Sequence, residues 1–540
     1  MPSGALFSLS DKTGATQLAQ ALHRRGVEIV ATSGTRKALE DAGVPARDVE
    51  TLTGFPALFD GRVKTLHPKI FGAILYDRAD DAHLAQRDTY AIPSIDVVVV
   101  NLYPFEATIA HEGTALAEAI EQIDIGGVSL LRAAAKNFSQ VAVLSHPSQY
   151  DEYLAALEAG ETSRGVGEIP LALRRKWAVA AFERTAEYDA AIAHYLAAEG
   201  ALLPGDLPGA LTLTLPLSQR LRYGTNPQAR AAFYLDRADY LPDQLHGKAL
   251  SYNNLLDLDA TLRLLARATP AATTNGSEVE PRAETTRAAV VKHTVPCGVA
   301  QRSTVDAAVR DALGADPTSA FGGIVAVDAR VTLAAAQALS TFFLEIVAAP
   351  DFDDDALALL RKKKNLRVMR FASELPARLA RELRVRSALG GVLAEDDDPN
   401  AARETWSVVS KRQLSAREWQ DAAFAWDVVR HVKSNGVVIV RDGVTRGICA
   451  GQTNRVSAVQ IATARANVAG NDASEAAGAR GAACASDGFF PFADGLEAAA
   501  AAGCTAVIAP GGSVRDEEVI AAANRLDIAL VFSTHRYFLH

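Results

Sequence analysis

Cysteine and aromatic side chains are scarce in this 540-residue sequence, which has four cysteines and 6% aromatic residues. This composition excludes a disulfide scaffold. Cys297, Cys449, Cys484 and Cys504 form no CxxC pair, which argues against a zinc ribbon or a thioredoxin-type motif. We therefore expect four reduced thiols, as in a cytoplasmic protein.

Long apolar runs and an excess of basic residues are absent as well. No uninterrupted apolar run approaches the roughly 18 residues of a membrane span. Residues 1–14 show no basic start followed by an apolar core, so we expect neither a membrane span nor a secretory signal. The 64 acidic residues outnumber the 55 basic ones, and the net charge of −9 argues against a nucleic-acid partner but not against small anionic ligands.

The first 150 residues alternate strand-like and helix-like segments. Apolar segments at residues 5–9, 27–31, 96–100 and 141–144 predict strands, and residues 36–42 predict a helix. The continuous apolar run at 96–100 is typical of a strand covered on both faces, so the pattern predicts a parallel α/β sheet. Ligands of such sheets bind beyond the carboxyl ends of the strands, where this chain has polar loops.

The length allows for about three to four domains at roughly 150 residues each. Residues 174–197 predict a helix, and the segment 200–216 marks the boundary between a domain over 1–199 and one over 200–540. In the second domain we expect strands at 289–291, 324–327, 437–440 and 506–508. Residues 268–286 predict an exposed loop, and residues 413–425, before a long helix, predict a joint between two subdomains.

Loops rich in small hydroxyl residues follow the first two expected strands. One reads Ser-Asp-Lys-Thr at residues 10–13 and the other Thr-Ser-Gly-Thr at residues 32–35. Free amides at a helix start, hydroxyl groups and a cation suit a phosphate group, although serine and threonine are also the commonest helix N-caps. Neither loop matches GxxxxGK[ST], so ATP or GTP hydrolysis gains no support.

Charged and polar residues continue along the same expected sheet edge. Residues 61–69 read GRVKTLHPK, which fits either a solvated basic loop or a clamp where negative charge develops. Tyr103 follows the strand at 96–100, and Asp124 precedes a glycine pair that lets the backbone approach a ligand closely. Together with Lys64 and Lys136, they place lysine, tyrosine, aspartate and lysine at successive strand ends.

Lys292 and His293 stand side by side between an expected strand and a proline turn. A lone histidine is more often a satisfied core or surface residue, but its pairing with lysine in a strand-to-turn segment favours a functional site. The aromatic run at residues 486–492, SDGFFPF, fits either a core cluster or a stacking surface for a flat heterocycle.

A zinc deaminase is the first alternative for this segment, because His293 and Cys297 fit part of its HxE…PCxxC signature. Val295 stands where the glutamate would be and Ala300 where the second cysteine would be. No zinc ligand set remains, so we expect no catalytic metal, although a related fold stays open.

The first domain resembles the cyclohydrolase domain of the bifunctional AICAR transformylase/IMP cyclohydrolase family. The resemblance rests on SLSDKTG, TSGTRKALEDAG, DGRVKTLHPKIFGAIL, NLYPF and EQIDIGGVSLLRAAAKN. It implies a methylglyoxal-synthase-like fold that closes the formylated imidazole carboxamide ribotide (FAICAR) to inosine monophosphate (IMP) with loss of water. It also implies a nucleotide pocket formed by Ser10, Asp11, Lys12, Thr32, Ser33, Gly34, Thr35, Arg62, Val63, Thr65, Asn101, Asp124 and Ile125.

Four residues would carry the ring closure. Lys64 can stabilise the negative charge that develops on the former formyl oxygen. Tyr103, Asp124 and Lys136 can move the protons, and the resemblance makes Lys136 the proton donor or acceptor. Which residue moves which proton stays open.

The second domain resembles the transformylase part of the same family. The motifs are LRYGTNPQ, LHGKALSYNNLLDLDA, VVKHTVPCGVA, SAFGGIVAVD, FLEIVAAP, SNGVVIV, AGQTNR, SDGFFPF, APGGS and HRYFLH, in this order. They imply two cytidine-deaminase-like subdomains without the metal. They also imply formyl transfer from 10-formyltetrahydrofolate to the 5-amino group of aminoimidazole carboxamide ribotide (AICAR).

The resemblance carries roles onto single residues here too. His293 would be the general base and Lys292 the transition-state stabiliser. AICAR would be held by Arg222, Tyr223, Asn254, Gly322, Asn435, Arg455, Phe489 and Arg536. The folate would lie near Glu345, Val456, Asp494 and Ser513.

The family pattern is not matched everywhere, and rival functions stay open. Val295 stands where we expect asparagine, and the C-terminus HRYFLH is less basic than expected. The resemblance implies a homodimer with transformylase sites between subunits, acting on small molecules. One rival is a nucleotide-sensing module whose first domain does no chemistry, and the other is a monofunctional transformylase with a decayed first domain.

Overall fold

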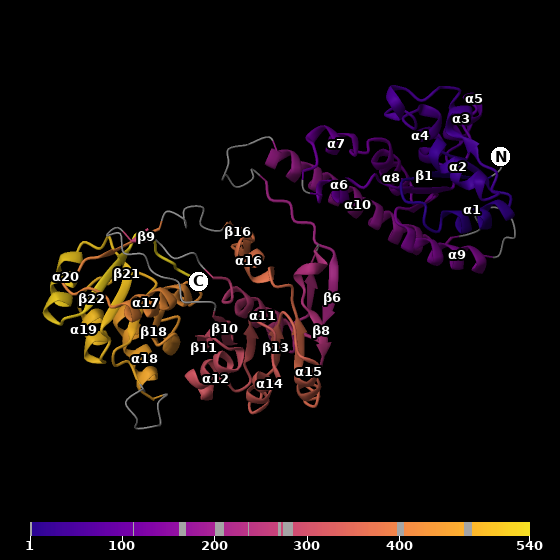
Figure 1. Cartoon of the computed structure of the whole chain (residues 1–540). Helices are drawn as coiled ribbons and strands as arrows, with labels where there is room; N and C mark the ends of the chain where they lie inside the picture. The colour runs from indigo at the N-terminus through magenta and orange to yellow at the C-terminus, as the bar shows by residue number, and fades with distance from the viewer. Residues whose placement is uncertain are drawn as a thin grey trace. The chain divides into compact units, whose positions relative to one another are not determined.

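The computed structural model describes residues 3–111, 113–160, 169–199, 210–235, 237–267, 272–273, 285–396, 404–468 and 478–540. The chain forms two compact units, Met1–Thr214 and Leu215–His540, each with its own main sheet (Figure 1). Most of the predicted boundary at 200–216 and of the predicted loop at 268–286 lies outside the described residues.

The sheet of the N-terminal unit is parallel throughout, which confirms the prediction. Its strands run in the order β3-β2-β1-β4-β5 and are β1 (Gly4–Leu9), β2 (Glu28–Ala31), β3 (Arg47–Asp48), β4 (Val97–Asn101) and β5 (Ala142–Leu144). The four expected strands lie within one residue of their predicted bounds. The valines at 97–100 are at most 1% exposed, as befits a strand covered on both faces.

Helices enclose this sheet. They are α1 (Ala15–Arg24), α2 (Ser33–Asp41), α3 (Val49–Thr53), α4 (Pro68–Leu75), α5 (Asp81–Thr89), α6 (Phe105–Ile109), α7 (Leu116–Glu121), α8 (Gly126–Lys136), α9 (Tyr150–Ala159) and α10 (Leu171–Glu199). The predicted helices at 36–42 and 174–197 correspond to α2 and α10. None of the helices in the described part of the chain has the length and apolarity needed to cross a membrane.

A 13-stranded sheet forms the C-terminal unit. Its first half contains β8 (Asp243–His246), β10 (Thr286–Lys292), β11 (Val295–Arg302), β12 (Ile324–Val327), β13 (Ile346–Ala349) and β14 (Arg367–Arg370). Its second half contains β17 (Thr405–Val408), β18 (Val437–Arg441), β19 (Val444–Cys449), β20 (Ala483–Ser486), β21 (Ala506–Pro510) and β22 (Ala529–Ser533), with β9 (Ala272–Thr273) at the edge. The four strands predicted for this domain are confirmed as β10, β12, β18 and β21.

The two halves of this sheet repeat one pattern. The antiparallel hairpin β10–β11 is followed outward by the parallel strands β12, β13 and β14, and the hairpin β18–β19 is followed by β20, β21 and β22. The halves meet where β11 pairs with β19. A helix precedes each hairpin, α11 (Tyr252–Arg263) in the first half and α17 (Ala416–Val429) in the second.

Both faces of the large sheet are covered. The core on one face joins α11, α16 (Leu375–Ala380) and α17 to alternate strand residues such as Val291 and Val438. On the other face, the first half packs against α12 (Val305–Ala315), α14 (Leu333–Ser340) and α15 (Asp354–Leu360), and the second against α18 (Arg455–Val468), α19 (Asp494–Ala501) and α20 (Asp516–Arg525). The remaining elements are α13 (Pro317–Ala320) and two hairpins, β6 (Leu217–Leu221) with β7 (Ala231–Tyr234) and β15 (Arg384–Ala388) with β16 (Gly391–Glu395).

The predicted joint at residues 413–425 is wrong in position, because α17 occupies most of that segment. The Ser415 side chain accepts a hydrogen bond from the Glu418 amide, and the Glu418 carboxylate accepts one from the Ser415 amide at 2.9 Å. This capping box starts the helix three residues after the predicted joint begins.

Two glycines allow the helices to lie close to the hairpins. A Cβ atom at Gly298 would lie 2.1 Å from the Ala312 carbonyl oxygen of α12, and one at Gly447 would lie 2.0 Å from that of Ala462 in α18. Both obstacles are backbone, so only glycine fits there without a shift of the helix.

We predict that Gly298→Ala lowers the free energy of unfolding by about 1–3 kcal/mol, because α12 must move away from the sheet. Urea denaturation followed by tryptophan fluorescence measures the change. The matched control is Gly314→Ala on the same helix, whose added Cβ would meet nothing within 4 Å. Equal stability of Gly298→Ala and Gly314→Ala would contradict the predicted close packing.

Candidate active sites

A cavity of about 680 Å³ opens at the carboxyl end of the N-terminal sheet. The strand order reverses direction at β1 there, which is where open α/β sheets bind ligands. The cavity brings together many of the predicted residues, namely Ser10, Lys12, Thr32, Gly34, Thr35, Arg62, Lys64, Thr65, Asn101, Tyr103, Asp124 and Ile125.

The start of α2 supplies hydrogen-bond donors to this cavity. Thr32 is the N-cap but makes no side-chain cap hydrogen bond, so the first amides of the helix have no capping side chain. The Thr35 hydroxyl instead accepts from the Leu9 amide at 3.0 Å. Uncapped amides and the positive end of the helix dipole favour a bound anion.

Asn101 holds the loop after β1 in place. Its side-chain oxygen accepts from the amides of Ser10 at 2.7 Å and Asp11 at 2.9 Å, and its side-chain nitrogen donates to the Asp11 carbonyl at 2.6 Å. These three hydrogen bonds join the ends of β1 and β4 and fix the loop that carries Lys12.

The cations of this cavity differ in how far they are neutralised. Arg62 is ion-paired with Glu121, which also lines the cavity. Lys12 donates to the Ser10 carbonyl at 3.2 Å, and within the described residues neither Lys12 nor Lys64 forms a salt bridge. Two ammonium groups without a salt bridge therefore favour a ligand that carries negative charge.

Asp124 sits where α8 begins. Its carboxylate accepts from the Gly127 amide at 2.6 Å, and its own amide donates to the Tyr188 hydroxyl at 2.8 Å. Burial raises the pKa of Asp124 above its ordinary value, and burial together with the Asp124 charge raises the pKa of Tyr103. A carboxyl group whose pKa is shifted toward neutrality suits proton transfer.

Four predicted residues do not line this cavity. Asp11 accepts from the amide and hydroxyl of Thr13, and Val63 forms a bridge with Leu58. Ser33 is the first residue of α2. Lys136 is exposed at the last residue of α8, so the helix rise of 1.5 Å per residue puts it roughly 15 Å from the start of that helix at the cavity.

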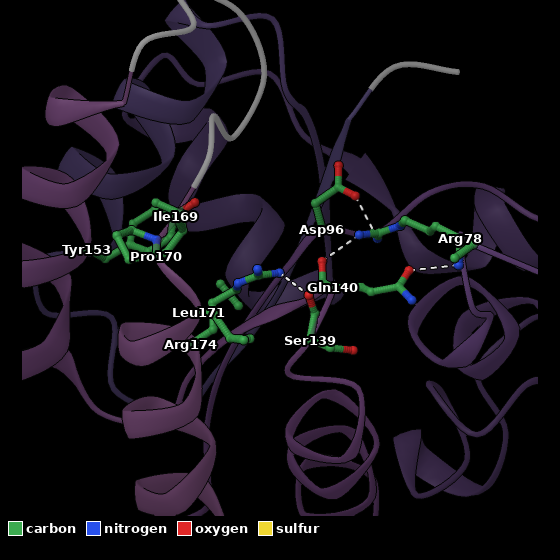
Figure 2. Close-up of a pocket in the computed structure, with 11 residues that line it drawn as sticks. Arg78, Asp96, Ser139, Gln140, Tyr153, Ile169, Pro170, Leu171 and Arg174 are labelled. Atoms are coloured by element: carbon green, nitrogen blue, oxygen red, sulfur yellow. Dashed lines mark hydrogen bonds and ion pairs between the residues drawn. The ribbon is translucent and has the colours of Figure 1, made fainter.

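A larger cavity of about 910 Å³ lies at the opposite edge of the same sheet. Figure 2 shows its charged groups turned toward one another and toward backbone. Arg78 forms an ion pair with Asp96 at 2.6 Å, and its backbone amide donates to the Gln140 side-chain oxygen at 2.7 Å. The Arg174 guanidinium donates to the Ser139 carbonyl. Because Asp96 precedes β4, this cavity faces the amino ends of the strands, away from the predicted site.

In the C-terminal unit, hydrogen bonds join some predicted residues into a first cluster at β10 and β12. The Lys292 ammonium donates to the Phe321 carbonyl at 2.8 Å, and the Gly322 amide donates to the Phe343 carbonyl at 2.7 Å. The Glu345 carboxylate is held at 2.7 Å by Arg367, whose side chain is 4% exposed.

The loop at residues 222–226 lies against the start of α11. Arg222 lies over the Tyr223 ring at 5.5 Å, and the Asn253 side chain donates to the Thr225 carbonyl at 3.3 Å. Asn254 is buried and forms a capping box with Ser251, so its amide group already has a structural role.

His293 and Thr294 form the two-residue turn between β10 and β11, with Lys292 paired to Val295. Their φ angles are 55° and 61°, a combination that type I′ turns require and that glycine or asparagine usually provides. For residues of other types this left-handed conformation costs about 1–3 kcal/mol each. The turn leaves the imidazole of His293 exposed.

A second cluster surrounds Arg455, which is 7% exposed. Its guanidinium forms an ion pair with Asp487, which is fully buried, and donates to the Gly436 carbonyl at 3.2 Å. The Ser434 hydroxyl also donates to Asp487, and the Asn435 side chain donates to the Gln452 carbonyl at 2.8 Å.

The C-terminal segment is tied to this second cluster. The Tyr537 amide donates to the Asp487 carbonyl at 3.1 Å, and the Tyr537 hydroxyl donates to Glu404 at 2.8 Å. Glu404, 6% exposed, also accepts from Trp406, Trp426 and Ser533. These contacts fix the segment that carries Arg536, whose guanidinium lies over the Phe538 ring.

Four further residues of the C-terminal unit that are predicted to bind ligands lie on or near α18, α19 and α20. Phe490 belongs to the core, as one reading of the aromatic run predicts, whereas Phe489 is exposed, and its stacking on a flat heterocycle stays a prediction. Val456 lies in the first turn of α18 and Asp494 starts α19. The Ser513 amide donates to Asp516 at 3.1 Å.

Sequence reasoning assigned no role to three residues that support these clusters: Asp257, Arg367 and Asp487. Asp257 lies inside the motif LHGKALSYNNLLDLDA. Its carboxylate accepts hydrogen bonds from the backbone amides of His293 and Thr294, a contact that the motif alone does not reveal. Arg367 and Asp487 are distinguished by their burial, which the sequence does not show. Because charged residues are rarely buried unless paired, burial would have pointed to both.

All four cysteines are free, and burial raises the pKa of Cys297 to about 12, which keeps its thiol protonated at neutral pH. Across the described ranges, no three His, Cys, Asp or Glu side chains are grouped so that they could hold a metal ion.

The fold and the matches to known proteins together define a bifunctional enzyme. Residues 14–129 match the MGS-like domain family, and residues 134–465 match the AICARFT/IMPCHase bienzyme family. The bifunctional purine biosynthesis protein PurH of Chloroflexus aurantiacus is 48% identical over 538 residues, covering 99% of this chain and 98% of that protein. PurH of Caulobacter vibrioides is 46% identical over 544 residues, covering 100% and 97%.

The chain therefore belongs to the AICARFT/IMPCHase bienzyme family. This confirms the family, the MGS-like N-terminal domain and the bifunctional enzyme that the motifs predict.

Proposed function

We propose that the chain catalyses two consecutive steps of purine biosynthesis. Residues 200–540 transfer a formyl group from 10-formyltetrahydrofolate to the 5-amino group of AICAR, and residues 1–199 close the resulting FAICAR to IMP. The observation that carries the proposal is the cavity that gathers Lys64, Tyr103 and Asp124 at the switch point of the first sheet. Free cysteines and small-molecule substrates suit a cytoplasmic location.

Ring closure needs orientation more than strong bases. The carboxamide nitrogen is a poor nucleophile, but it attacks a formyl carbon of the same molecule, and a well-oriented intramolecular reaction can save about 7–11 kcal/mol. Lys64, which has no salt bridge among the described residues, is available to stabilise the oxyanion that forms. Asp124 and Tyr103 move protons during loss of water. The role of Lys136 as proton donor or acceptor rests on the family resemblance alone, because Lys136 does not line this cavity.

Formyl transfer needs a base and a cation. The amine of AICAR is weakly nucleophilic, so His293 takes its proton as the nitrogen attacks the formyl carbon. Lys292 stabilises the tetrahedral oxyanion before the bond to N10 of the folate breaks and N10 receives a proton. AICAR lies against Arg222, Tyr223, Asn254, Gly322, Asn435, Arg455, Phe489 and Arg536, and the folate lies near Glu345, Val456, Asp494 and Ser513.

The first test is the ring closure itself. We predict that the full chain converts FAICAR to IMP, and that Gly127→Ala lowers the rate at least tenfold. A Cβ at Gly127 would lie 2.4 Å from the Asp124 carboxylate and displace it. Ultraviolet absorption of IMP measures the rate, and formyl transfer by the same variant is the internal control.

FAICAR binding without turnover by the unaltered chain would contradict this proposal. That result would favour a nucleotide-sensing module or a monofunctional transformylase with a decayed first domain.

The second test separates the two activities. We predict that His293→Ala lowers formyl transfer more than 100-fold, because loss of a general base typically costs about 10²–10⁴ in rate. Ring closure should change less than twofold, because it uses the other unit. Assays of the two half-reactions on one preparation measure both, and a parallel loss would contradict separate sites.

We also propose that the chain acts as a homodimer whose transformylase sites lie between subunits. The hairpin β15–β16 supports this, because Val385, Leu389, Val392 and Leu393 are exposed on a two-stranded sheet. Such a hairpin is marginally stable in water unless another surface covers it. A second copy of the chain would provide that surface.

We predict that Leu393→Asp shifts the dimer toward monomer and lowers formyl transfer at least tenfold, since a buried charge without a partner is unfavourable at an interface. Size-exclusion chromatography with light scattering gives the oligomeric state. The control is Glu395→Gln on the same strand, which removes no apolar surface and should leave the oligomeric state unchanged. A stable dimer of Leu393→Asp with full activity would count against this interface.

A further inference from the structure

The two hairpins of the C-terminal unit occupy equivalent places in its repeated pattern. Lys292 pairs with Val295 across the first turn, and Arg441 pairs with Val444 across the second. Each hairpin also has a register irregularity close to the turn, where one residue of the second strand, Cys297 or Arg446, has no partner in the register. The two residues of the first turn, His293 and Thr294, therefore correspond to Asp442 and Gly443 of the second turn.

Each turn is held by a carboxylate from the helix that precedes its hairpin. Asp421 of α17 accepts from the amides of Asp442 and Gly443, both at 2.8 Å. Asp257 of α11 accepts from the amides of His293 at 3.3 Å and Thr294 at 2.6 Å. The same device thus occurs twice in one chain, with both oxygens of each carboxylate in use.

The residues inside the two turns differ. The second turn is Asp-Gly, a pair that adopts positive φ readily and that favours type I′ turns. The first turn is His-Thr, and threonine at positive φ is unusual because its side chain is β-branched. The sequence of the second turn favours its conformation even without Asp421, whereas the sequence of the first turn does not favour its conformation.

We propose that Asp257 is a positioning residue for formyl transfer, which holds the His293–Thr294 turn in its left-handed conformation and so aims Lys292 and His293 at the substrate. Asp257 acts through two backbone amides and touches no reacting atom. The proposal rests on the proposed role of His293 as the base.

The test compares substitutions of Asp257 in the full-length enzyme. Asp257→Ala should lower the kcat of formyl transfer roughly 100-fold, the effect expected when a catalytic group moves by about 1 Å. Asp257→Asn keeps one accepting oxygen and should lose roughly tenfold. AICAR affinity by calorimetry and ring closure by the same chain should each change less than threefold, and circular dichroism should show an unchanged fold.

A rescue variant separates conformation from charge. Glycine adopts positive φ without the steric cost of threonine, so Thr294→Gly added to Asp257→Ala should recover kcat at least tenfold. The matched control is Asp259→Asn, two positions along α11, where the lost carboxylate is an exposed partner of Arg263 and not of the turn. It should leave formyl transfer within twofold of the unaltered enzyme.

Two results would overturn the inference. Unchanged kcat in Asp257→Ala would show that the turn holds itself. Equal losses in Asp257→Ala and Asp257→Asn, with no recovery on adding Thr294→Gly, would show that Asp257 acts through its charge. If His293→Ala retains formyl transfer, the proposed base itself fails, whereas failure at Asp257 alone leaves that base intact.

Discussion

Backbone amides that lack a partner within their own helix or strand are the constraint shared by the two sites. In the N-terminal unit, the amides at the start of α2 face a cavity that also holds Lys12 and Lys64. In the C-terminal unit, the amides of the His293–Thr294 turn point at Asp257. Because buried amides need acceptors, the first arrangement favours an anionic ligand and the second fixes the protein itself.

This difference matches the chemistry of the two reactions. Ring closure joins two groups of one molecule, so the site must mainly bind the nucleotide and stabilise one oxyanion. Formyl transfer joins two molecules and needs an accurately placed base, a role that we propose for His293 on its tight turn between two buried strands. The conformational cost of that turn, about 1–3 kcal/mol for each residue, is small beside the packing of a large sheet covered on both faces.

The repeated halves of the C-terminal unit show how such a site can arise within a stable frame. Gly298 and Gly447 let a helix approach each hairpin, and Asp257 and Asp421 hold each turn. The second hairpin has Asp-Gly where the first has His-Thr. The frame is therefore common to both halves, and the two side chains that we propose to be reactive, Lys292 and His293, belong to the first half.

Much of the fold was predictable because the core strands are continuous apolar runs. The valines of β4 are an example, whereas the two-residue β3 has no such pattern. The predicted joint at 413–425 is misplaced because the Ser415–Glu418 capping box starts α17 inside that segment.

The candidate site was predictable to a different extent in each unit. The residues of the first cavity follow their strands directly, so the parallel sheet alone brings Ser10, Thr32 and Asn101 together. The contact of Asp257 with a turn 36 residues away depends on how α11 packs, which no local pattern specifies. The length of α8 alone implies that Lys136 lies at the far end of this helix from Asp124.

The central claim is that the Lys292–His293 turn faces the amine of AICAR. A crystal structure of the enzyme with AICAR and a folate analogue tests it most directly. The account predicts an imidazole nitrogen of His293 within about 2.6–3.2 Å of the 5-amino group, and the Lys292 ammonium near the formyl position. AICAR bound with its amine away from this turn, against other side chains, would contradict the account.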